Sequence, residues 1–127
     1  MTSPSTPSIA PWISVPNATA AVDFYTRALG AEEREVLRDE DSGRVIVAQL
    51  AVGDADFWLQ DDPDVPDSVS GGKPVHMILA VPDPDAAFER ALQAGAEEIN
   101  PVGEGNGWRI GRMADPYGNH WEIGRRL

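Results

Sequence analysis

The pattern of apolar and polar positions occurs twice along the chain. Each copy opens with a short apolar run, 13–15 in the first copy and 78–81 in the second, and a Val-Pro-Asx turn closes each run. Apolar residues at helical spacing follow in both copies: Ala21, Val22, Tyr25 and Leu29, then Ala87, Phe88, Ala91 and Leu92. Each helical stretch ends near a Gly-Ala-Glu-Glu sequence. The repeat predicts a strand, a turn and a helix in each half of the chain.

Both predicted helices carry signals at their two ends. Asn17 and Asp83 are expected N-caps, because their side-chain oxygens can accept hydrogen bonds from free amides of the first turn. Gly30 and Gly95 stand where a left-handed C-cap is expected.

Three strand-like runs follow each helix. The runs span 34–38, 44–52 and 56–60 in the first copy, and 97–102, 108–114 and 120–125 in the second. We expect a flexible loop at 103–107, a tight turn at 115–119, and a linker at 61–74 that is rich in Asp, Pro, Ser and Gly. The prediction is an α+β fold of two βαβββ repeats, at about 9–62 and 73–127.

Composition narrows the class of protein. A chain of 127 residues suits one domain, which we place at 9–127 after a Ser/Thr/Pro-rich disordered tail at 1–8. The sequence has no cysteine, which excludes thiolate metal sites and cysteine nucleophiles. Its formal net charge of -11 opposes nucleic-acid and anionic membrane partners. With no signal peptide and no apolar run of membrane-spanning length, the expected location is the cytoplasm.

Two sequence signatures resemble those of the vicinal oxygen chelate superfamily, which contains glyoxalases, bleomycin-resistance proteins and dioxygenases. They are Asp-Phe-Tyr-Thr-Arg-Ala-Leu-Gly at 23–30 and Asp-Pro-Tyr-Gly-Asn-His-Trp-Glu-Ile at 115–123, and the resemblance extends over 9–127. It implies curved mixed sheets around a cleft. It does not imply one activity, because the superfamily contains isomerases, dioxygenases, transferases and non-catalytic proteins that sequester antibiotics.

The resemblance also implies four metal-ligand positions, of which this chain keeps two. His76 and Glu122 match the histidine and glutamate positions of the second copy, whereas Ala10 and Trp58 occupy them in the first. Strand alternation places His120 on the face of Glu122, where it could be a third ligand. Alternatively, His76 is a hydrogen-bonded pocket histidine, and Glu122 pairs with Arg109 or Arg112. We therefore expect no resident cofactor, with a divalent metal as the alternative.

Aromatic residues indicate a different use of the cleft. Strand alternation directs Trp12 and Trp58 to the cleft and directs Phe57 and Trp121 to the core. Indoles offer stacking area and one N–H donor, which suits an aromatic ligand. The alternative is that Trp12 and Trp58 merely fill a disused pocket.

These observations favour a protein that binds a small organic molecule, such as an antibiotic or another natural product. The resemblance implies a homodimer that closes the cleft. The alternatives are a metal-dependent lyase, isomerase or dioxygenase, and a degenerate domain that acts as an interaction module. The expected ligand-binding residues are Trp12, Asp56, Trp58, Gln60, His76, His120 and Glu122.

Overall fold

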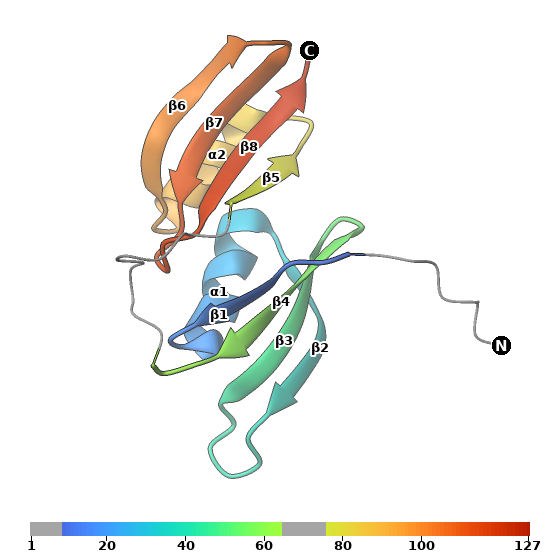
Figure 1. The fold of residues 1–127 in the computed structure, drawn as a ribbon, viewed down its shortest axis with the longest axis vertical. Helices are drawn as coiled ribbons and strands as arrows, with labels where there is room; N and C mark the ends of the chain where they lie inside the picture. The colour runs from blue at the N-terminus through green and yellow to red at the C-terminus, as the bar shows by residue number, and fades with distance from the viewer. Residues whose placement is uncertain (1–8, 65–75) are drawn as a thin grey trace, which may run out of the picture.

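A computed structural model describes residues 9–64 and 76–127 (Figure 1). The predicted tail at 1–8, and the predicted linker from residue 65 onward, lie outside the described residues. The elements in chain order are β1 (Trp12–Val15), α1 (Ala18–Leu29), β2 (Glu32–Arg38), β3 (Val45–Val52), β4 (Ala55–Asp61), β5 (His76–Ala80), α2 (Pro84–Gln93), β6 (Glu97–Gly105), β7 (Trp108–Ala114) and β8 (His120–Arg126).

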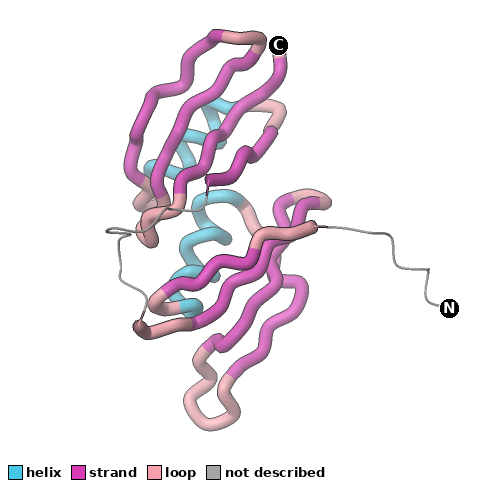
Figure 2. The backbone as a smooth tube through the Cα atoms, in the orientation of Figure 1, coloured by secondary structure: helices cyan, strands magenta, loops and turns pink. Residues whose placement is uncertain are grey.

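The chain forms two four-stranded sheets with the same topology. Their strand orders are β1-β4-β3-β2 and β5-β8-β7-β6. In each sheet the first strand pairs in parallel with the last, and the other pairs are antiparallel. In the orientation of Figures 1 and 2, β7 and β8 pass in front of α2, whereas β2 and β3 lie to the side of α1. The α+β class and the two βαβββ modules are thus confirmed.

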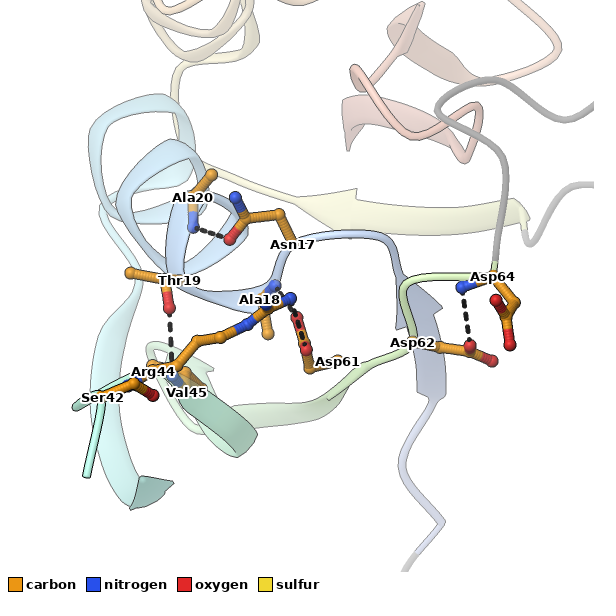
Figure 3. Close-up of polar contacts among 10 residues, drawn as sticks. All are labelled: Asn17, Ala18, Thr19, Ala20, Ser42, Arg44, Val45, Asp61, Asp62 and Asp64. Atoms are coloured by element: carbon orange, nitrogen blue, oxygen red, sulfur yellow. Dashed lines mark hydrogen bonds and ion pairs between the residues drawn. The ribbon is translucent and has the colours of Figure 1, made fainter. Parts of the chain in front are cut away.

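The N-terminus of α1 is fixed to its own sheet by polar side chains (Figure 3). Asn17 accepts from Ala20 N at 3.1 Å, which confirms the predicted cap. Asp61 accepts from Ala18 N with one carboxylate oxygen and from Arg44 Nη2 with the other, both at 2.8 Å. These hydrogen bonds satisfy amide groups of the first helical turn that have no partner within the helix.

The two helices end differently. Gly30 caps α1 with φ 71° and ψ 26°, the left-handed conformation that glycine adopts at little cost. Ala94 caps α2 in the right-handed conformation, and Gly95 follows with φ 115° and donates its amide to the Leu92 carbonyl, so a positive-φ glycine ends this helix one residue after the cap. Asp83 caps the start of α2 as predicted, accepting from Ala86 N at 3.2 Å. The helices also touch each other, since Arg90 of α2 donates from Nε to the Arg27 carbonyl at the end of α1 at 2.8 Å.

Two predicted boundaries are wrong. The glycine-rich segment at 103–107 is not a loop, because β6 continues through Gly105 and only the Asn106-Gly107 turn separates it from β7. Asp61 belongs to β4 and not to the linker. In both places the backbone pairs with a neighbouring strand, which outweighs the low strand propensity of the residues.

An aromatic core joins the modules. Tyr25 of α1 packs against Phe57 and Trp121, with ring centroids 5.2 and 5.6 Å away, and all three rings are buried. The prediction that Phe57 and Trp121 belong to the core is confirmed. Among the described residues, no helix is long and apolar enough to cross a membrane.

Candidate functional site

Each sheet has one face that its own helix leaves uncovered, which we call the open face. In the first sheet, Trp58 lies directly beside Trp12 on β1 and Gln49 on β3. Asp56 and Gln60 flank Trp58 at alternate positions of β4, so they share its side of the sheet. All four predicted residues of the first module, Trp12, Asp56, Trp58 and Gln60, therefore lie on one open face.

The two indoles of this face form a stacked pair. Their ring centroids are 5.9 Å apart with an interplanar angle of 21°. Trp12 is 53% exposed and donates from Nε1 to Gln60 Oε1 at 2.9 Å, which fixes its ring. Asp56 accepts from Gln49 Nε2 at 3.0 Å. The result is a flat aromatic surface with carboxylate and amide groups around it.

The open face of the second sheet carries charged and imidazole groups. His76 Nε2 lies 2.9 Å from Glu122 Oε2, and Arg112 Nη2 lies 3.8 Å from the same oxygen. His120 is beside His76 on the neighbouring strand, with ring centroids 6.2 Å apart. Of the two arginines predicted as possible partners of Glu122, the structure places Arg112 beside it. Arg109 instead binds Asp85 of α2 and Glu104.

Arg112 is the residue of this face that sequence reasoning undervalued. It lies directly across from Glu122 in the β7–β8 register. Its Nε is buried without a hydrogen-bond partner among the described residues. Its place in the sequence could have revealed this contact. A tight turn at 115–119 joins the two predicted strands, and antiparallel pairing across that turn brings Arg112 beside Glu122.

The expected residues fall into two clusters, one on each sheet. The hydrogen bonds, ion pairs and ring contacts of the described site residues stay within one sheet or the other. Between the modules lies a groove of about 440 Å³. Asp56 reaches this groove from the first sheet and Ile78 from the second, together with Ala10 just before β1. The groove therefore reaches an edge of each open face, although Trp58 and Glu122 do not line it.

The donor groups do not make a complete metal site within one chain. In the first module the β1–β4 register pairs Trp12 with Trp58, and in the second the β5–β8 register pairs Ile78 with Glu122. These matching registers support the view that Trp58 occupies the position in the first module that Glu122 occupies in the second. An indole and the methyl group of Ala10 cannot coordinate an ion at the other two positions. Across residues 9–64 and 76–127, no group of three or more His, Asp or Glu side chains could hold one. His76 and Glu122 supply two donors where a catalytic ion needs about three protein ligands.

Comparison with known proteins agrees with this architecture. The model of a glyoxalase-like domain family matches residues 12–124. An uncharacterized protein of Mycobacterium bovis is 38% identical, over 94% of this chain and 83% of its own length. The chain therefore belongs to the glyoxalase-like domain family, within the vicinal oxygen chelate superfamily.

Solved structures show the same fold at lower identity. TioX from Micromonospora sp. ML1 superposes with a TM-score of 0.73 at 24% identity, over 95% of this chain and 97% of TioX. A glyoxalase/bleomycin resistance protein/dioxygenase family enzyme from Burkholderia phytofirmans gives a TM-score of 0.74 at 21% identity, over 91% of this chain and 95% of that one. At these identities the likeness concerns the fold alone.

Proposed function

We propose that the protein binds a small organic molecule, such as an antibiotic or another natural product, and holds a planar part of it on the first open face. The observation that carries the proposal is the Trp12–Trp58 stack, in which Trp12 is exposed and Trp58 is half-buried. A stacked indole pair offers a planar ligand a large apolar surface at a small cost in side-chain freedom.

The second open face supplies polar anchors. Glu122 can accept hydrogen bonds, Arg112 can donate them, and His76 can do either according to its protonation. A ligand that extends from one open face to the other would meet an aromatic surface at one end and charged groups at the other. We further propose that a second copy of the chain covers the open faces.

The experiment is a tryptophan-fluorescence titration with a panel of aromatic natural products. We expect the substitution Trp58→Ala to weaken binding by about two- to ten-fold, which corresponds to the loss of one stacked aromatic contact. Trp108→Ala is the matched control. It also removes one indole, but from the second sheet, where Arg126 lies 5.2 Å over the ring. Equal affinities of the Trp58→Ala variant and the parent would show that the ligand does not stack on Trp58.

A metal-dependent lyase, isomerase or dioxygenase is the second candidate. The 2.9 Å contact between His76 and Glu122 favours it, because these residues occupy two positions where the superfamily binds its metal. The side chain of Arg112 counts against it, since a guanidinium 3.8 Å from the Glu122 carboxylate competes with a cation. We therefore place this activity second.

A further inference from the structure

Trp58 has a second face, and it lines a pocket of its own. Trp12 stacks on one side of the Trp58 indole, toward β1. On the side of β2 and β3 lies an open pocket of about 580 Å³. Its lining residues are Glu35, Val36, Leu37, Val47 and Trp58. Leu37, Val47 and Trp58 contribute apolar side chains, whereas the side chain of Val36 packs against the core.

Trp58 and Glu35 stand at opposite ends of one row across the first sheet. The strand registers place Trp58, Gln49 and Glu35 in one row across β4, β3 and β2. Two inter-strand spacings separate Trp58 from Glu35, or about 10 Å, which is enough for a fused two-ring system. The intervening Gln49 turns its amide to Asp56 at 3.0 Å and does not line the pocket.

The electrostatics of the pocket favour a cation. Among the described residues, Glu35 is the only charged group in its lining. Glu35 makes no ion pair with any residue in the described part of the chain, although Glu32 and Glu33 on the same strand pair with Arg34 and Arg38. The face of an indole also attracts positive charge. The chain's net charge of -11 adds a long-range attraction for cations.

We propose that this pocket is a subsite for a planar aromatic cation, such as an N-alkylated heteroaromatic ring or an aryl amidinium. The ring lies against Trp58 and over the side chains of Leu37 and Val47, and its positive end faces the Glu35 carboxylate. The proposal rests on the proposed small-molecule binding and specifies the charge of the ligand. It separates Glu35, which selects charge, from Trp58, which binds any flat ring.

The test compares two probes of nearly the same shape, N-methylquinolinium and neutral quinoline. Binding is followed at low salt through the indole Nε1–H resonance of Trp58 in the isotopically labelled protein. We expect the parent to prefer the cation, and Glu35→Gln to weaken cation binding by about two- to five-fold, as for an exposed charge pair. Quinoline binding should not change. Added salt should reduce the preference for the cation.

The control variant is Glu40→Gln, which removes an equal charge from the turn between β2 and β3, outside the pocket lining. Loss of cation preference in Glu35→Gln but not in Glu40→Gln supports the subsite. Equal loss in both variants, or equal binding of the two probes to the parent, overturns it. Trp58-dependent binding of neutral aromatics would then leave the proposed function standing. Failure of the parent to bind N-methylquinolinium also overturns the subsite, and the natural-product titration then decides the proposed function separately.

Discussion

Asp115 is a buried carboxylate whose two oxygens accept four hydrogen bonds. One oxygen accepts from the backbone N–H groups of Tyr117 and Asn119, and the other from the Tyr25 hydroxyl and Trp121 Nε1. Only 4% of Asp115 is exposed. A charge this deep is tolerated because donors surround it. Since Tyr25 belongs to the first module and Asp115 to the second, the network fastens one module to the other.

The Tyr25 hydroxyl gives a prediction that depends on pH. Burial, and then the charge of Asp115, raise the pKa of Tyr25 well above its ordinary value of 10.0. The folded protein therefore favours the protonated hydroxyl, and the stability this provides is present below pH 10.0 and is lost as the pH rises toward the folded-state pKa. We expect Tyr25→Phe to lower the free energy of unfolding by about 1.5–3 kcal/mol near neutral pH, as for a hydrogen bond to a charged group.

Urea unfolding of the parent and of Tyr25→Phe, at neutral pH and above pH 10.0, measures the effect. The stability difference between the two proteins should shrink at alkaline pH, because the parent must keep Tyr25 protonated in order to fold. A difference that stays constant across this range would contradict the raised pKa.

At this scale the sequence predicts local contacts well and distant ones poorly. The caps at Asn17 and Asp83 depend on amides three residues away, so local spacing was enough. The bond between Tyr25 and Asp115 joins residues 90 positions apart, and no local pattern marks it. Gly124 is similar, because a Cβ there would lie 2.6 Å from Ile110 Cγ1. That requirement becomes visible only when β7 and β8 are paired.

At the scale of elements, the repeat predicted both modules because each strand and helix has its own periodic pattern. Boundaries failed where pairing overrode propensity, as in the extension of β6 through Gly105. Strand alternation correctly gave the face of Trp12 and Trp58, and that of His120 and Glu122. Strand alternation could not predict that the expected site residues form two separate clusters, one on each sheet, because that depends on how the two modules pack.

The equivalence of the two modules can be tested by rebuilding ligands in the first. We expect the parent to purify without stoichiometric transition metal, and the double variant Ala10→His with Trp58→Glu to gain affinity for a divalent ion such as Zn²⁺. The physical reason is that the double variant has a histidine and a glutamate at the positions that His76 and Glu122 occupy in the second module. There, His76 Nε2 and Glu122 Oε2 lie 2.9 Å apart. Elemental analysis and a zinc titration by calorimetry measure the outcome.

The control for this variant moves the carboxylate two residues along β4, as Ala10→His with Gln60→Glu. The same chemical groups are then present, but out of register with the second module. Equal zinc affinity in both double variants would mean that the added groups act nonspecifically. About one metal ion per chain in the purified parent would instead favour the metal-dependent enzyme.

The whole molecule leaves its two open faces without cover from its own helices. Exposed apolar side chains stand on both of them, with Leu37 59% exposed on the first and Ile78 64% exposed on the second. The faces differ in chemistry, because the Trp12–Trp58 stack lies on the first sheet whereas His76, Arg112 and Glu122 lie on the second. A two-fold axis can set the first sheet of each chain against the second sheet of its partner, so that both unlike pairs form at once.

This complementarity predicts a homodimer that an added charge on the open face disrupts. We expect the parent to sediment as a dimer at micromolar concentration, and Ile78→Asp to shift it toward the 13.7 kDa monomer. The reason is that an unpaired carboxylate would be buried in the interface, at a cost of several kcal/mol. Ala20→Asp is the control, since it adds the same charge to an exposed position of α1, the helix on the other side of the first sheet. Sedimentation of the parent as a monomer alone would contradict the dimer, and equal dissociation of both variants would mean that added net charge, and not the open face, controls assembly.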